Sequence, residues 1–337
     1  ISVYEPGISE LADIPKEDPA TYDMLCRGDS IGVFQVESRA QMSMLPRLKP
    51  RKFYDLVIEI AIVRPGPIQG DMVHPFLRRR DGLEEVSYPS EAIREVLEPT
   101  MGVPIFQEQA IRMAMVAAGF SGGEADQLRR AMASWGKNGN LMKFESKLID
   151  GMLERGYTQE YANRIFEQIK GFGGYGFPEA HSASFALLCY ISSWLKCHHP
   201  AAFYCALLNS LPMGFYSASQ LVQDAQRHNI LVLPVDVQQS NWENSLEVRI
   251  ESKQRQRALR LGLCRIKGLS ESCGIRIEQA RGNRSYSSTV ELAGRAKLSK
   301  ADLQRLASAD ALNAIAGHRY QAGWQAAGVE PERPLLK

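Results

Sequence analysis

Glycine and proline divide most of this chain into short segments whose apolar residues recur at the spacing of an α-helix. The segment from Phe53 to Ala61 is one example. It stops at Arg64-Pro-Gly-Pro67 because proline lacks the amide that a helix needs and restrains the residue before it. The β-branched residues in this segment leave a strand as the alternative. The same spacing predicts further helices over residues 111–118, 125–132 and 162–169. A last predicted helix has one apolar face, formed by Phe185, Leu188, Cys189 and Ser192. The chain is therefore predicted to be mainly α.

Two short segments depart from the helical spacing. Residues 230–237 are rich in β-branched residues, and residues 259–266 alternate in character, so each is predicted to be a short strand. Residues 238–247 between them are polar, which favours a domain boundary in this stretch. The sequence therefore predicts a mainly α fold with a few short strands, divided into a domain of residues 1–240 and a domain of residues 241–337.

The charge of the chain is unevenly distributed. The whole sequence carries 40 Lys and Arg against 38 Asp and Glu, which gives a formal charge of +2, but residues 251–337 hold 16 basic and 8 acidic side chains. The first 250 residues hold 24 basic and 30 acidic side chains. A basic end of this kind is typical of a surface that meets a polyanion, and a solvated basic surface is the alternative.

A capped helix carries a pair of adjacent arginines. Ser121 and Glu124 have the spacing of a capping box, which predicts the start of a helix directly after one that ends near Gly119. On the new helix, Arg129 borders the apolar face and Arg130 opposes it. Arginine forks match phosphate oxygens, so such a pair can clamp a polyphosphate. In the alternative, Asp126 lies one turn before Arg130 and forms a surface ion pair with it.

Two further groups of residues have the composition of nucleic-acid contacts. Arg78-Arg79-Arg80 is a basic cluster that either forms a solvated face or contacts the DNA backbone. Leu263–Arg281 has the layout of a helix-hairpin-helix, in which the amides of the turn Lys267-Gly268-Leu269-Ser270 meet a DNA phosphate without reading a base. Ser270 stands where such a turn usually has its second glycine.

The glycine-rich sequence over residues 171–176 matches the pattern GxGxxG. It follows a predicted helix instead of a strand and has no acidic residue about 20 positions further on, so a dinucleotide site is not expected. Two interpretations of this loop remain. Its glycines could let the backbone approach a ligand while Phe172, Tyr175 and Phe177 stack on a base, or it is a tight turn whose aromatic side chains fill the core.

The chain lacks an obvious reaction centre. It contains no P-loop, no HExxH and no DxD pair that could hold two metal ions, so no catalytic residue and no metal ligand is expected within it. The consecutive residues Cys197-His198-His199 cannot all point at one ion from a helix. Six cysteines without a CxxC pair favour reduced thiols and a cytoplasmic location. We expect no membrane span and no signal peptide, and a chain that begins at Ile1 is expected to be part of a longer protein.

Several motifs in fixed order resemble the alpha subunit of bacterial DNA polymerase III, a C-family DNA polymerase. The resemblance covers essentially the whole chain. Residues 212–216 and 224–228 look like the error-prone, damage-inducible branch of that family. The motifs that carry the family resemblance are Val33-Phe-Gln-Val-Glu-Ser38, Arg64-Pro-Gly-Pro67, Phe106-Gln-Glu-Gln109, Ala125-Asp-Gln-Leu-Arg-Arg-Ala-Met132 and Gly174-Tyr-Gly-Phe-Pro-Glu-Ala-His-Ser182.

The resemblance implies that this chain is the fingers domain, ending in the helix-hairpin-helix region of the little finger. The family transfers a deoxynucleotide from its triphosphate to a primer 3′-hydroxyl, here for translesion synthesis in the DNA damage response. The metal-binding aspartates belong to the palm, so Mg²⁺ is expected in the full enzyme with ligands outside this chain. The implied partners are primer-template DNA and the nucleotide, with a sliding clamp and damage-response accessory proteins as further candidates.

The resemblance also assigns roles to individual residues. Arg129 and Arg130 stand in the arginine-bearing fingers motif and are assigned to the triphosphate. Arg64 would brace or touch a phosphate, and Tyr175 and His181 are expected near the nascent base pair.

One departure from the family pattern follows the arginine motif. Residues 134–136 are Ser-Trp-Gly where the replicase typically has lysines, and Lys137 comes next as a further candidate triphosphate contact. The alternative function for the whole chain is a non-enzymatic helix-hairpin-helix module that binds DNA, which the basic end and the hairpin support without any family resemblance.

Overall fold

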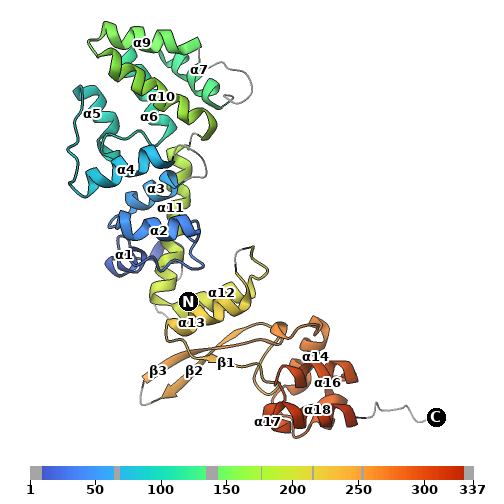
Figure 1. Cartoon of the computed structure of the whole chain (residues 1–337). Helices are drawn as coiled ribbons and strands as arrows, with labels where there is room; N and C mark the ends of the chain where they lie inside the picture. The colour runs from blue at the N-terminus through green and yellow to red at the C-terminus, as the bar shows by residue number, and fades with distance from the viewer. Residues whose placement is uncertain are drawn as a thin grey trace. The chain divides into compact units, whose positions relative to one another are not determined.

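The structure is a computed structural model, and it describes residues 10–63, 69–133, 143–175, 177–214, 216–251 and 254–329 (Figure 1). The described chain is mainly α-helical, as predicted, and has one small sheet. It divides into two compact units, which we call the first unit (residues 10–194) and the second unit (residues 195–329). None of the described helices is long and apolar enough to cross a membrane.

The first unit consists of helices. In chain order they are η1 (Leu11–Asp13), α1 (Pro19–Cys26), α2 (Arg39–Leu48), α3 (Phe53–Ile62), α4 (Gln69–Arg80), α5 (Glu91–Leu97), η2 (Glu98–Thr100), α6 (Gln107–Ala118), α7 (Gly122–Ala133), α9 (Glu145–Glu154), α10 (Gln159–Tyr175) and α11 (Glu179–His198), of which the last turn belongs to the second unit.

Helices α5, α6, α7, α9 and α10 pack around one apolar core (Figure 1). Met113, Ala117, Leu128, Phe166 and Ile169 are each at most 3% exposed in that core. Burial of these apolar side chains is the main stabilising contribution to the helical cluster. The packing of α7 in this cluster fixes the position of α7.

The junction between α6 and α7 follows the predicted local chemistry. Gly119 ends α6 with a φ of 72°, which glycine adopts without steric cost. At the start of α7, the Ser121 amide donates to Glu124 Oε2 (3.0 Å), and the Glu124 amide donates to Ser121 Oγ (3.4 Å). The predicted capping box is therefore confirmed, and it sets where the arginine-bearing helix begins.

The segment with the β-branched residues is helix α3 and not a strand. Leu56, Val57, Ile58 and Ile60 are all buried, so packing surrounds the helix on most sides. This burial outweighs the modest helix penalty of β-branched residues. Residues 64–68, which include the proline motif predicted to stop the segment, lie outside the described residues.

The buried face of α11 is displaced from the predicted one. Cys189 is buried as predicted, but Leu188 is 45% exposed, and serines at positions 182 and 193 are buried instead. The Ser182 hydroxyl donates to the Val57 carbonyl (2.5 Å), and the Ser193 hydroxyl donates to the Cys189 carbonyl. A serine that satisfies its hydroxyl in this way can face the core, which an apolar spacing does not reveal.

The prediction of a glycine-rich loop over residues 171–176 was wrong for residues 171–175. These residues continue helix α10 to Tyr175. Upstream, Ile165, Phe166 and Ile169 anchor the helix in the core, and this packing offsets the low helix propensity of the glycines.

The second unit begins with the end of α11 and contains the small sheet. Its elements are α12 (Pro200–Asn209), α13 (Ala218–Arg227), β1 (Val232–Leu233), β2 (Ser245–Glu251), β3 (Gln254–Arg260), η4 (Leu263–Arg265), α14 (Glu271–Arg281), α15 (Thr289–Ala296), α16 (Lys300–Ser308), α17 (Asn313–Ala316) and α18 (Arg319–Gly328).

The sheet has the strand order β1-β3-β2, with β1 parallel and β2 antiparallel to β3. The predicted strand over residues 259–266 was mostly wrong, because β3 ends at Arg260 and the chain then turns into η4. Gly262 fits this turn closely, since an added Cβ would lie 2.4 Å from the backbone of residues 242 and 243. Strand β2 occupies part of the stretch that the sequence suggested as a polar boundary.

The helices from α14 to α18 pack around a second apolar core. Leu263, Ile277, Leu292, Leu303 and Leu312 are fully buried there. The turn between η4 and α14 lies at the surface of this cluster, and α18 closes its C-terminal end (Figure 1). The domain limits at residues 1–240 and 241–337 stay a prediction, and the compact units divide the chain earlier, after Trp194.

Candidate nucleotide and DNA contact sites

Two segments that carry family motifs, residues 106–109 and 174–182, meet helix α3 at the start of α11. The Glu179 amide, which opens the helix, donates to Glu108 Oε2 on α6 (3.0 Å), and the Tyr54 hydroxyl on α3 donates to Glu179 Oε1 (2.7 Å). The Gln107 amide donates to the Phe177 carbonyl (3.2 Å). An anionic side chain at a helix N-terminus satisfies a free amide and the helix dipole together, so Glu108 stabilises the start of α11.

An aromatic ladder runs along this end of α11; we use this name for Phe177, His181, Phe185 and Phe34. Ring centroids are 5.1 Å apart between Phe177 and His181, 4.1 Å between His181 and Phe185, and 5.3 Å between Phe185 and Phe34. His181 is exposed, and its ring lies between two phenylalanine rings. Neighbouring rings are inclined to one another by 62°, 50° and 86°, in the tilted and edge-to-face arrangements that aromatic pairs prefer.

The two predicted arginines on α7 are exposed and share one carboxylate. Asp126 accepts from Arg129 Nη2 at 2.8 Å and lies 2.6 Å from Arg130 Nη2. The guanidinium side chains are 50% and 74% exposed, respectively. Hydrogen bonds from Arg129 and then from Arg130 lower the pKa of Asp126 below its ordinary value. The surface ion pair that the sequence suggested as the alternative for Arg130 is therefore present, and it includes Arg129 as well.

The other predicted nucleotide contacts lie on different elements, and some of them lie outside the described residues. His181 lies on α11 in the aromatic ladder, and Tyr175 is the last residue of α10, which packs against α7. The side chain of Tyr175 lies outside what the structure describes, as do Arg64 and Lys137 entirely.

The basic cluster at the end of α4 is largely engaged by the protein itself. Arg79 donates to Glu84 (3.0 Å) and to the Met101 carbonyl (2.8 Å). Arg80 donates through both terminal nitrogens to Asp55, each at 2.8 Å. Arg78 approaches Glu84 at 3.3 Å but keeps a mostly exposed side chain, so it has the most hydrogen-bonding capacity left for an external phosphate.

The predicted hairpin turn lies at the surface, between η4 and α14. Lys267, Gly268 and Ser270 are exposed, and Leu269 is buried beneath them. Gly268 has a φ of 81°, where a side chain would be strained. The Ser270 hydroxyl accepts from the Cys273 amide and caps α14. The Leu269 amide donates to the Ile266 carbonyl (3.2 Å), so this amide of the turn is bonded within the fold.

Some neighbours of these sites were not predicted from sequence. The Arg305 side chain lies beside Gly268, with Nε 3.2 Å from where a Cβ would stand, so a second cation adjoins the turn. No local pattern connects these two residues, because Gly268 lies in the turn before α14 and Arg305 lies on α16. By contrast, Phe177, His181 and Phe185 are spaced four residues apart, and this helical spacing was a usable signal.

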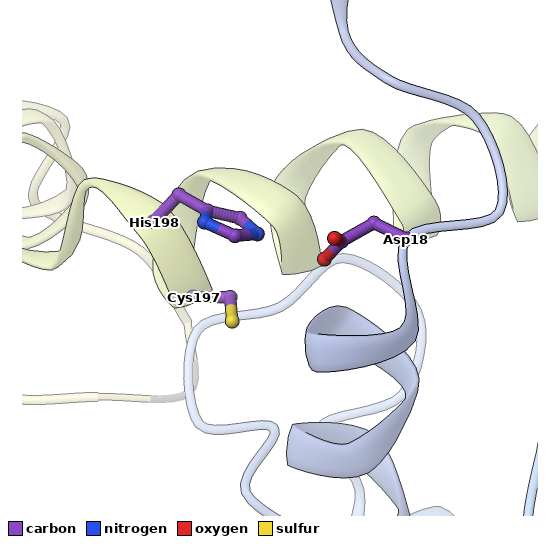
Figure 2. A group of neighbouring side chains, drawn as sticks. All are labelled: Asp18, Cys197 and His198. Carbon is purple, nitrogen blue, oxygen red and sulfur yellow. The ribbon is translucent and has the colours of Figure 1, made fainter.

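The cysteine and histidine side chains at the end of α11 are the residues that the sequence analysis considered as metal ligands and did not expect to form a metal site. Cys197 and His198 extend from its last turn, while Asp18 precedes α1 and accepts from the Thr21 amide at 2.8 Å (Figure 2). That residues 197–199 do not form a metal site stays a prediction.

Comparison with known proteins relates this chain to one group. A family model described as bacterial DNA polymerase III alpha subunit finger domain matches residues 4–156, and one described as helix-hairpin-helix motif matches residues 229–322. The chain is 69% identical to the error-prone DNA polymerase of Teredinibacter turnerae over 336 residues, 67% identical to that of Saccharophagus degradans, and 60% identical to that of Methylococcus capsulatus.

These matches cover 100%, 100% and 96% of this chain, respectively, but 32%, 33% and 32% of the relatives. The chain thus spans about a third of the length of the curated relatives it matches. The match to residues 4–156 contains α7 and its arginines, and the match to residues 229–322 contains the hairpin turn. The chain therefore belongs to the bacterial DNA polymerase III alpha subunit family, in which it corresponds to the finger domain and the helix-hairpin-helix region that follows.

Proposed function

We propose that this chain supplies the fingers of an error-prone, DNA-directed DNA polymerase, and that Arg129 and Arg130 hold the triphosphate of the incoming deoxynucleotide. The observation that carries the proposal is the exposed arginine pair on the capped helix α7, inside the region that matches the finger domain. The similarity to error-prone DNA polymerases supports nucleotidyl transfer as the reaction and translesion synthesis as its use.

The arginine pair contributes charge and direction. With Asp126 it forms a group of net charge +1, and both guanidinium groups keep exposed donors for phosphate oxygens. Holding the triphosphate by its oxygens orients the leaving pyrophosphate for in-line attack by the primer 3′-hydroxyl. In the same proposal Arg64 and Lys137 contact phosphate, and Tyr175 and His181 lie near the nascent base pair, where the exposed His181 ring supplies an aromatic contact.

The chemistry of nucleotidyl transfer in such polymerases depends on divalent metal ions, and we propose Mg²⁺ with ligands elsewhere in the longer protein. The nearest approach to a DxD pair in the sequence is Glu124-Ala-Asp126 on α7. Glu124 is engaged by Lys147 and Asp126 by two arginines, so neither carboxylate fits a metal centre. The role of this chain is therefore binding and orientation.

The DNA itself is proposed to meet two surfaces. The turn Lys267-Gly268-Leu269-Ser270 would bind a backbone phosphate, and Arg78, with Arg79 and Arg80 beside it, is the proposed contact on the first unit. A sliding clamp and damage-response accessory proteins are proposed as further partners, and the cytoplasm as the location.

Steady-state kinetics of the longer polymerase test the arginine assignment. Arg129→Ala and Arg130→Ala are each expected to raise the KM for nucleotide or lower kcat by about 10-fold or more, which corresponds to about 1.4 kcal/mol of lost stabilisation. Arg94→Ala is the matched control, because Arg94 is a half-exposed arginine on α5 that also pairs with surface carboxylates. Arginine variants with the kinetics of this control would remove the clamp from the proposal.

The second candidate function is a DNA-binding module without activity of its own, which the basic turn and the helix-hairpin-helix match favour. It predicts duplex binding that weakens steeply with salt. Lys267→Ala should reduce the log-log salt slope by about 0.9, the value for one phosphate contact, while Lys16→Ala on the first unit should leave the slope unchanged. Palm aspartates in the reading frame upstream of Ile1 would favour the polymerase.

A further inference from the structure

Helix α18 carries two large aromatic side chains on its outer face. Trp324 is 82% exposed and Tyr320 is 71% exposed, whereas Ala322 and Ala326 on the same helix are fully buried. At 100° per residue, Tyr320 and Trp324 project about 140° and 180° from the direction of the buried alanines. The two rings therefore lie on one face, one turn apart, and point away from the core of the second unit.

Burial in the fold accounts for another tryptophan of the second unit but not for this one. Trp242 packs on α14 so closely that a Cβ at Gly274 would lie 2.2 Å from its ring. Trp324 makes no comparable contact, since its side chain is the most exposed of the large apolar residues in the described chain. A tryptophan and a tyrosine left in water on one face are typical of a binding surface.

The charge around the two rings points to an anionic ligand. Helix α18 contains no acidic residue, and the Arg319 guanidinium lies 5.5 Å from the centre of the Tyr320 ring. The His318 ring lies 6.1 Å from the same ring, at the N-terminus of the helix, where the dipole favours a negative charge. Residues 254–329 contain 13 Lys and Arg against five Asp and Glu.

We propose that the outer face of α18 binds single-stranded DNA by stacking unpaired bases on Trp324 and Tyr320, with a neighbouring phosphate held by Arg319 and the helix N-terminus. Unpaired bases supply flat apolar surfaces and their backbone supplies negative charge, and this combination matches the face. Paired bases are already stacked inside the duplex, so the ligand is a single strand. The site consists of other residues than the arginine pair on α7 and the turn at Lys267.

Binding of a labelled oligothymidine to the 337-residue chain tests the proposal at constant salt. Trp324→Ala should weaken binding about 10-fold, while Trp324→Phe should stay within about 3-fold of the unchanged protein, because phenylalanine still stacks. Trp324→Leu is the decisive variant, since leucine keeps an apolar side chain but cannot stack, and it should behave as Trp324→Ala does. Val290→Ala, which shortens an exposed apolar residue on the adjacent helix α15, is the matched control and should have no effect.

An abasic strand of the same length separates stacking from charge. The unchanged protein should bind this strand about 10-fold more weakly than oligothymidine, and Trp324→Ala should cause no further loss with it. Arg319→Ala should instead reduce the salt dependence of binding to both strands by about one phosphate contact. Equal binding of the abasic strand and oligothymidine would overturn the proposal, and so would full binding by Trp324→Leu, which would indicate a purely apolar contact.

The longer protein supplies the final control, since one of its own segments could cover α18. The part of the acrylamide quenching that is lost in Trp324→Phe comes from Trp324 and measures how accessible its side chain is. We expect Trp324 to be accessible without DNA and to be shielded from acrylamide when oligothymidine binds. If Trp324 in the longer protein is already shielded without DNA, another protein segment covers α18, and this result would overturn the proposal. These outcomes are independent of nucleotide KM, so they are distinguishable from a failure of the arginine clamp.

Discussion

Asp126 and Arg130 form an ion pair across one turn of α7, with a carboxylate oxygen and a guanidinium nitrogen 2.6 Å apart. Arg129 donates to the same carboxylate from the adjacent position. A triphosphate bound by the two arginines would compete with Asp126 for their donors. The aspartate therefore orients the arginines and, at the same time, reduces the charge that they offer to a ligand.

Neutralising this aspartate should strengthen nucleotide binding. Because the arginines lower the pKa of Asp126, it is ionised at neutral pH, and Asp126→Asn removes a full negative charge. We expect the KM for nucleotide in the longer polymerase to fall by about 2- to 5-fold, the range of an exposed ion pair. Asp150→Asn on α9 is the control, as an exposed aspartate bonded to Ser146. A higher KM in Asp126→Asn would mean that orientation outweighs charge.

The pair between Asp55 and Arg80 should be important for stability. The Asp55 side chain is 2% exposed and accepts from both terminal nitrogens of Arg80 and from the Arg51 amide. Asp55→Asn leaves the partly buried Arg80 guanidinium without its charge partner and should cost about 3 kcal/mol in urea unfolding, the lower end of the range for a buried pair. Asp23→Asn, which breaks an exposed pair with Arg51, should cost less than about 1 kcal/mol.

The same pair gives stability a defined pH dependence. Burial raises the pKa of Asp55, but hydrogen bonds from Arg80 and from the Arg51 amide outweigh it, so the net pKa is lowered. The contribution is therefore present above the unfolded pKa, near 3.8, and is lost as the pH falls through the folded pKa. The difference in stability between the unchanged protein and Asp55→Asn should shrink below about pH 4. A difference that stays constant in acid would contradict this assignment.

Glu59 should have the opposite pH dependence. It is fully buried on α3, and neither carboxylate oxygen has a hydrogen-bond partner within the described ranges. Burial raises its pKa well above the ordinary value of 4.5. The folded chain thus keeps a proton that the unfolded chain releases, so stability is full below the unfolded pKa and falls as the pH rises, by about 1.4 kcal/mol per pH unit.

Glu59→Gln removes this titration and tests it. Urea unfolding should give similar stabilities for the two proteins near pH 4, and the variant should become progressively more stable toward neutral pH. Glu95→Gln, an exposed change on α5, should leave the slope unaltered. Parallel pH profiles for the unchanged protein and Glu59→Gln would show that Glu59 does not carry the buried proton.

Two glycines in neighbouring helices should respond to alanine with opposite signs. At Gly274 on α14 a Cβ would lie 2.2 Å from the Trp242 ring, so Gly274→Ala should destabilise the second unit by about 1 to 3 kcal/mol. At Gly294 on α15 nothing lies within 4 Å of a Cβ, so Gly294→Ala should stabilise by up to about 1 kcal/mol through helix propensity. Thermal unfolding of both variants checks this, and a shift of Tm in the same direction for both would contradict it.

Local chemistry was predictable from the sequence where a few adjacent residues determine the structure. Gly119 and the Ser121–Glu124 capping box fixed the boundary between α6 and α7 without reference to any distant residue. The pairing of Asp126 with Arg130 on α7 followed from helical spacing for the same reason, whereas the pairing of Asp126 with Arg129 was not predicted.

Features that depend on distant contacts were not predictable in this way. Ser182 is buried on α11 because the Val57 carbonyl of another helix accepts its hydroxyl. Residues 171–175 are helical because packing upstream holds α10 together. The Arg305 side chain beside Gly268 comes from a helix that follows 30 residues later in the chain, and only the assembled cluster brings them together.

The hydrogen bond from the Glu179 amide to Glu108 has a mechanical consequence. Glu108 lies in the first turn of α6, and α6 packs against α7. Helix α6 therefore contacts both the start of α11, which carries the aromatic ladder, and the arginine-bearing helix α7. A tilt of α7 on substrate arrival would pull on the residue that anchors the beginning of α11. In the proposed binding mode, occupancy at the phosphate end of the nucleotide would in this way be transmitted to the aromatic ladder around His181.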